Sequence, residues 1–170
     1  MKIHKNKQIF MAIAALGLGL LAGCGQKEEA APAQKTVHKH EHKPPHHGTP
    51  VVLGDEEYHM ELVLDAPAGK LQAYIMDGEL ENFVRIKTDS FEITASLPGQ
   101  EQLLLFKPIA NNATGETAGD TSLFEAHADW LKTTTEFDAA IKAVTVNGKT
   151  YQNIHFNFPK GKDTDEKKEK

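Results

Sequence analysis

The chain has 170 residues, of which 25% are charged, and its formal net charge at pH 7 is −5 with neutral histidines. An acidic balance argues against a nucleic-acid partner, because phosphate binding needs a basic surface, whereas it suits cations. Cys24 is the only cysteine, which excludes an internal disulfide. The fold must therefore rest on its apolar core.

Residues 1–23 have the organisation of a bacterial secretory signal. A start with three lysines precedes an apolar run at residues 9–21. This run is too short for a transmembrane helix, which needs about 20 apolar residues. It closes on Leu21-Ala22-Gly23-Cys24, which resembles the lipobox of bacterial lipoproteins. The resemblance implies that Cys24 is acylated and becomes the first mature residue. An uncleaved anchor helix and an ordinary secretory signal are the alternatives.

The resemblance to lipoproteins also implies a location. Gly25 follows the cysteine, and in Gram-negative lipoproteins a residue other than Asp there does not favour retention in the inner membrane. We therefore expect a lipid anchor at Cys24 in the outer membrane, with the protein facing the periplasm. The removed signal carries three of the lysines, so the mature chain has 16 basic and 24 acidic residues and a formal charge of −8.

Residues 24–50 form a His-rich linker. Their Lys, Glu, Ala, Pro and His composition has too little apolar surface to offset the entropy of ordering, so we expect a disordered tether. Five histidines fall within ten residues: His38, His40, His42, His46 and His47. Short tracts of this kind commonly bind metal, and the Irving–Williams order favours Cu²⁺ over Zn²⁺ or Ni²⁺. We expect weak binding in several modes; the alternative is a soluble spacer.

Residues 51–158 read as one domain of mostly period-two strands. Alternating apolar and polar residues predict strands at residues 57–65, 71–76, 84–87 and 91–97, and further strands are expected at 102–108 and 122–128. A short helix is predicted within residues 130–141, capped by Thr134 or Thr135. Asn147-Gly148 predicts a closing hairpin, and residues 159–170 a disordered charged tail.

This pattern predicts an all-β fold, an antiparallel β-sandwich of seven or eight strands with a short helix. An orthogonal barrel with similar strand spacing is the alternative. Within the predicted strand at 57–65, alternation places His59 with Glu57 and Glu61 on the face opposite the apolar residues. We expect that face to be solvated. It is either an ordinary polar face, or His59 shares a metal site there with His46 and His47. His127 and His155 are expected at the surface or rim, and whether they converge with His59 is left open.

The chain carries no sequence pattern of a nucleophile elbow, a zinc protease or a phosphate-binding loop, so we do not expect an enzyme. Residues 45–65 and 69–78 resemble small His-rich envelope lipoproteins. They also resemble a segment near the N-terminus of periplasmic adaptors of heavy-metal efflux systems, in the pattern His, small, Gly, then Val-x-Leu-Gly-Asp-x-x-x-His-x-Glu-Leu. The resemblance implies His46, His47 and His59 as metal ligands. The long coiled-coil hairpin and lipoyl-like region of an adaptor have no counterpart in the sequence.

Two functions follow from these observations. The first is a cell-envelope lipoprotein that binds divalent transition metal ions through the His-rich tract, for buffering or for hand-over linked to metal efflux. The second is a structural or protein-interaction lipoprotein, whose β-domain binds an envelope efflux or assembly protein while the tract serves only as a spacer.

Overall fold

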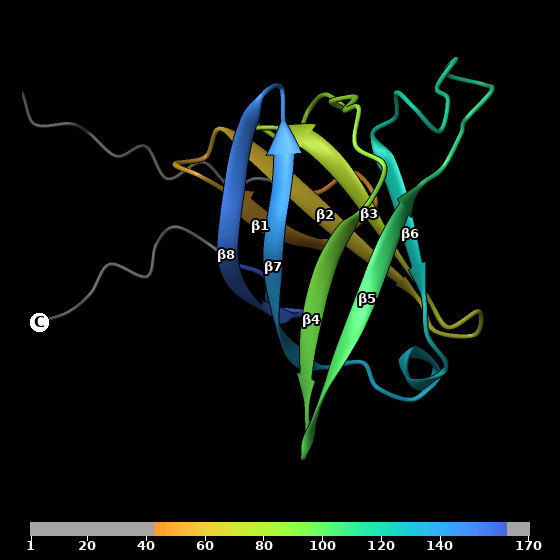
Figure 1. Ribbon diagram of the computed structural model, residues 1–170, viewed down its shortest axis with the longest axis vertical. Helices are drawn as coiled ribbons and strands as arrows, with labels where there is room; N and C mark the ends of the chain where they lie inside the picture. Colours follow the sequence, from red (N-terminus) through yellow and green to blue (C-terminus); the bar gives the residue numbers. More distant parts are fainter. Residues whose placement is uncertain (1–42, 163–170) are drawn as a thin grey trace, which may run out of the picture. The chain divides into compact units, whose positions relative to one another are not determined.

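The computed structural model describes residues 43–162, which form an all-β fold (Figure 1). Eight antiparallel strands make one sheet in the order β1-β2-β3-β6-β5-β4-β7-β8. This confirms the predicted all-β antiparallel class with seven or eight strands. The strands are β1 (Thr49–Leu53), β2 (Tyr58–Asp65), β3 (Lys70–Asp77), β4 (Phe91–Leu97), β5 (Gln100–Pro108), β6 (Leu123–His127), β7 (Phe137–Val146) and β8 (Lys149–Phe158).

The sheet is nearly closed, and its two halves face each other across the core as the layers of a sandwich do. The half β1-β2-β3-β6 lies behind the half β5-β4-β7-β8 in Figure 1. They meet at one side in a short ladder, where Lys107 pairs with Glu125 and Pro108 with Phe124. At the other side Lys162 bonds to β1, receiving a hydrogen bond from the Val52 amide at 3.3 Å.

The core is filled by the inward residues of both halves. Met60 and Leu62 of β2 and Ile93 of β4 are fully buried. The Phe91 and Phe106 rings stack with their centroids 4.9 Å apart. Burial of a large apolar side chain is worth about 1.5–3 kcal/mol, so a core of this size supports the fold without a disulfide.

The region predicted to hold a short helix contains a single 3-10 turn, η1 (Asp129–Lys132), and then the start of β7. Helix at residues 136–141 was the wrong expectation. Phe137, Ala139 and Ile141 are buried and pack into the core, while Asp138 is exposed and Ala140 is intermediate. This is a period of two, and pairing with β4 stabilises it.

Residues 84–87 are not a regular strand. The segment after β3 makes isolated bridges instead, between Met76 and Phe83 and between Ile86 and Thr121. The Val84 amide donates to the Ile75 carbonyl at 2.8 Å. The chain therefore folds back beside β3 without building a ladder.

The folded part is longer than the predicted residues 51–158. β1 already begins at Thr49, and the Pro44 carbonyl accepts a hydrogen bond from the His47 amide at 3.0 Å in a turn before it. Residues 43–50, assigned to the linker by composition, thus belong to the fold, as do residues 159–162. Cys24, His38, His40 and His42 lie outside the described residues. Within residues 43–162, no helix is long and apolar enough to span a membrane.

Candidate functional site

A buried carboxylate on β2 organises the candidate site. Glu61 points away from the main core, as its neighbours Met60 and Leu62 point into it, yet its side chain is 0% exposed. One carboxylate oxygen accepts hydrogen bonds from the His46 amide at 2.8 Å and the Gly48 amide at 2.9 Å. The other lies 2.8 Å from His46 Nδ1. These bonds fasten the turn before β1 to the outer face of the sheet.

The imidazole of His46 lies flat against an aromatic ring. It stacks on Tyr74 of β3 with centroids 3.9 Å apart and an interplanar angle of 17°. Tyr74 is the cross-strand partner of Glu61, so the strand register delivers both contacts of the imidazole. Phe83 closes a third side, 5.7 Å from the His46 ring. The side chain of His46 remains 34% exposed, which leaves one edge of the ring accessible to solvent.

The Glu61 bond determines which ring nitrogen carries the hydrogen. An ionised carboxylate only accepts hydrogen bonds, so Nδ1 of a neutral His46 donates to it. Nε2 then carries the lone pair, and it makes no hydrogen bond to any residue of the described chain. A histidine fixed in this way through one nitrogen by a carboxylate is the arrangement that metal-binding histidines use.

The surroundings of the ring are negative and partly desolvated. Burial, together with the charges of Glu61 and Glu125, raises the pKa of Tyr74. The hydroxyl of Tyr74 therefore stays protonated at neutral pH and adds no charge beside His46. Glu125 is paired with Lys70 at 3.6 Å, so the charge that favours a cation beside the His46 ring is that of the buried Glu61.

His59 lies on the predicted face of β2, but that face is not solvated, and the expectation of a solvated His59 is wrong. The residue is 1% exposed, and its Nδ1 lies 3.3 Å from the Asp77 carbonyl. Its cross-strand partners are Val52 and Met76. These two residues and Leu80 are buried outside the main core cluster. The outer face of β1–β3 thus carries a small apolar layer of its own.

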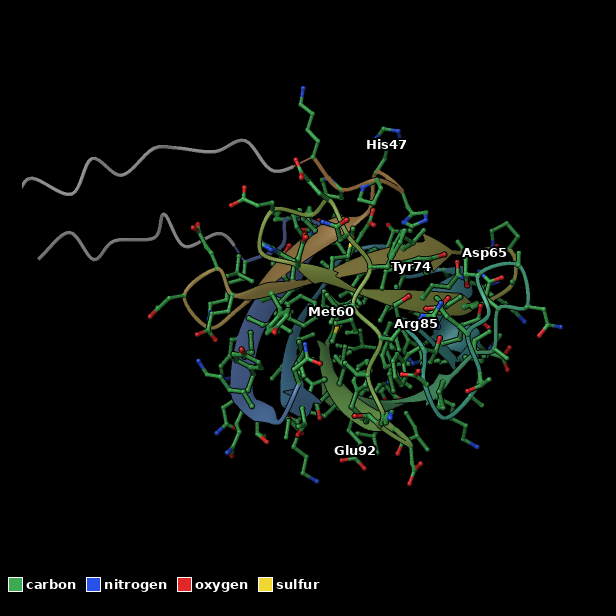
Figure 2. All side chains as sticks on the ribbon, turned by 90° about the horizontal axis from the view of Figure 1, so that it is seen from above. His47, Met60, Asp65, Tyr74, Arg85 and Glu92 are labelled. Atoms are coloured by element: carbon green, nitrogen blue, oxygen red, sulfur yellow. The ribbon has the colours of Figure 1, made fainter. Side chains whose placement is uncertain are left out.

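The predicted ligands are not brought together in the described part of the chain. His46 meets Glu61, His47 is exposed, and His59 is buried on β2. Figure 2 shows His47 at the top of the view, pointing away from the sheet. No three His, Cys, Asp or Glu side chains in residues 43–162 form a group that could hold a metal. His127, 63% exposed beside Glu125, and the exposed His155 are surface residues, as expected.

A second polar cluster surrounds Glu116, which sequence reasoning did not identify. The carboxylate accepts hydrogen bonds from the hydroxyl groups of Ser122 and Thr114, each at 2.6 Å, and lies 3.8 Å from Arg85. Burial acts to raise the pKa of Glu116, but these bonds, the Ser122 amide and the Arg85 charge outweigh it and hold the pKa below its usual range. The cluster orders the loop at residues 111–121.

A half-open cleft of about 450 Å³ lies next to Arg85. The guanidinium of Arg85 already donates hydrogen bonds to the Gly115 carbonyl at 3.3 Å and to the Thr114 carbonyl. Those bonds leave the guanidinium little capacity for a ligand. The other residues that line the cleft are Ile86, Lys87, Thr88, Asp120, Thr145, Asn147 and Gly148.

Comparison with known proteins returns no family model, no curated protein and no solved structure that matches this chain.

Proposed function

We propose that the protein is a cell-envelope lipoprotein, anchored through Cys24, that binds divalent transition metal ions with His46 as an ordered ligand. The observation that carries this proposal is the 2.8 Å contact between His46 Nδ1 and the buried Glu61 carboxylate. By holding the ring hydrogen on Nδ1, the carboxylate leaves the lone pair on Nε2 for a metal ion. Stacking on Tyr74 limits rotation of the ring.

One imidazole is not a complete site, so the remaining ligands come from the His-rich tract. His47 is adjacent to His46, and His38, His40 and His42 precede His46 within eight residues. In this arrangement His46 is a fixed first ligand, and chain entropy is lost only on the side of the tract. We propose Cu²⁺ as the preferred ion over Zn²⁺ and Ni²⁺, following the Irving–Williams order. Metal buffering or hand-over to an efflux partner is the corresponding role.

The experiment reverses the tautomer while keeping the fold. In Glu61→Gln the amide oxygen still accepts from the two backbone amides, but the amide nitrogen now donates to His46 Nδ1. The hydrogen of the ring moves to Nε2, which can no longer bind a metal. We expect Cu²⁺ and Zn²⁺ affinity at the tightest site to fall about 10- to 100-fold in calorimetric titration.

Glu92→Gln is the matched control, because Glu92 lies on β4 in the opposite half of the sheet, where it pairs with Lys142 at 2.9 Å, and the change should leave affinity unchanged. Equal affinity of the wild type and Glu61→Gln would remove His46 from the site. No binding of either ion to the wild type below roughly 100 μM would overturn the metal function itself. Deletion of residues 38–42 separates the contribution of the tract from that of His46.

The affinity should also depend on pH. Imidazole must be neutral to bind a metal ion, and the unperturbed pKa of histidine is about 6.5. Binding should therefore weaken steeply as the pH falls below that value. Titrations at pH 7.5 and 5.5 measure the change, and an affinity that is the same at both would exclude imidazole ligands.

A further inference from the structure

Strand β5 has one edge that no other strand covers along most of its length. On one side, residues 91–97 of β4 pair with residues 100–106 of β5. On the opposite side β6 pairs only with Lys107 and Pro108. Within residues 43–162, residues 100–106 therefore have no strand beside them on that side. Figure 1 shows the β4–β5 hairpin extending beyond the end of β6.

The open edge presents free backbone groups. The Ile109 amide donates to the Leu123 carbonyl of β6 at 2.9 Å, so the backbone groups of Ile109 face away from β4. In an antiparallel strand this direction alternates with each residue. The amides and carbonyls of Glu101, Leu103 and Leu105 consequently face the same open side. Three residues thus offer a template for another strand.

The side chains along this edge are apolar at its centre. Leu103 is 58% exposed and Leu105 is 44% exposed, and with Phe83 they are the exposed large hydrophobic residues of the described chain. Natural edge strands are usually blunted by charge, proline or bulges at these positions. Here the charges lie only at the two ends, Glu101 and Lys107. An open edge with two exposed leucines is typical of a surface that pairs with another chain.

We propose that this edge pairs antiparallel with the same edge of a second copy of the chain, about a two-fold axis at Leu103. The open window is centred on that residue, between the β4–β5 turn and the point where β6 begins. In this register Leu103 faces the partner's Leu103, and Glu101 faces the partner's Leu105. Leu103 and Leu105 of the two copies, four leucines in all, then form one apolar strip across the dimer interface.

Charge complementarity identifies a second copy as the occupant. In the proposed register Lys107 of each chain lies diagonal to the partner's Glu101, within reach of long side chains on adjacent strands. The two opposite charges flank the leucine strip symmetrically, so the edge is complementary to itself. An isologous contact of this kind is how most two-fold dimers are built. The proposal does not depend on metal binding.

Cysteine cross-linking in the full chain tests the register. Directly opposed residues of an antiparallel pair have Cα atoms about 4.5–5.5 Å apart, within the range for a disulfide. We expect Leu103→Cys to form a disulfide-linked dimer on non-reducing gels of membranes. Leu105→Cys should link much less, because it faces Glu101, and the double variant Glu101→Cys/Leu105→Cys should link efficiently. Wild type, with Cys24 alone, and Gln152→Cys on the exposed face of β8 are the controls.

Sedimentation of the detergent-solubilised full chain tests the dimer itself. The wild type should be dimeric, and Leu103→Lys should weaken association at least tenfold while retaining the circular dichroism of the wild type. Glu101→Lys should weaken it through repulsion by Lys107, and Lys107→Glu in the same chain should restore it. A monomeric wild type at roughly 100 μM, or a Leu103→Lys protein that remains fully dimeric, would overturn the proposal.

Discussion

Replacing Glu61 by alanine should destabilise the fold and detach the turn before β1. The variant removes an acceptor that is 0% exposed and that serves the His46 amide, the Gly48 amide and His46 Nδ1. Hydrogen bonds to a charged group contribute about 1.5–3 kcal/mol each. His46 and Gly48 are partly accessible and regain water when the acceptor is lost. The net loss should therefore be about 3 kcal/mol, below the gross sum of three such bonds.

Urea unfolding followed by circular dichroism measures this loss. With a slope of about 2 kcal/mol per molar urea, the midpoint should fall by about 1.5 M. Amide hydrogen exchange of His46 and Gly48 should become fast in the same variant. Glu79→Ala, at an exposed position in the turn after β3, is the matched control and should change stability by less than about 0.5 kcal/mol. A loss below about 1 kcal/mol with unchanged exchange at both amides would refute the role of Glu61 as the anchor.

Three further predictions concern the fold. Because the folded pKa of Glu116 is depressed, its contribution to stability is present above the unfolded pKa of about 4.3 and is lost as the pH falls through the folded value; unfolding between pH 5 and pH 3 should show a shallower acid loss in Glu116→Gln. Gly78→Ala should lower the melting temperature strongly, because its Cβ would overlap the Glu56 carbonyl oxygen, whereas Gly119→Ala, with nothing within 4 Å, should not. Leu131→Ala removes the only buried side chain of η1 and should cost about 3 kcal/mol in chemical unfolding; a wild-type unfolding curve would show that this turn does not close the core.

Period-two alternation predicted most strands because each has one face on the core. In β4, Phe91, Ile93 and Ala95 are buried, and the hairpin around Asn147-Gly148 joins β7 to β8 as its turn residues indicate. Such patterns depend only on local residue order. They therefore hold wherever the partner strand supplies an ordinary apolar core.

The helix prediction at residues 136–141 also rested on local residue order alone, and for that reason it failed. Glu136, Ala139 and Ala140 favour a helix by propensity, and Thr134 and Thr135 precede them as candidate caps. Pairing of Ala139 with Ala95, and of Ile141 with Ile93, is a long-range contact that local propensity does not contain. Tertiary pairing outweighed a preference of a few tenths of a kcal/mol per residue.

Alternation also assigned Glu61 and His59 to the correct face of β2 without revealing that the face is covered. Coverage comes from residues 43–48 and from the segment that follows β3, both distant in sequence. One local signal was present in Gly48. A Cβ there would lie 2.5 Å from the Leu62 carbonyl and 2.9 Å from the Glu61 side chain, so only glycine permits the turn to approach the strand.

The position of the last linker histidines connects the fold to the chemistry of the tract. Composition assigned His46 to a disordered tether, in which its two ring nitrogens would exchange the hydrogen freely. Docking onto Glu61 and Tyr74 fixes the ring and its tautomer. A ligand fixed before the metal arrives loses less entropy on binding than one in a free chain. The folded domain would then contribute to affinity through a single preorganised imidazole, and Glu61→Gln measures that contribution directly because it changes the tautomer and leaves the tract untouched.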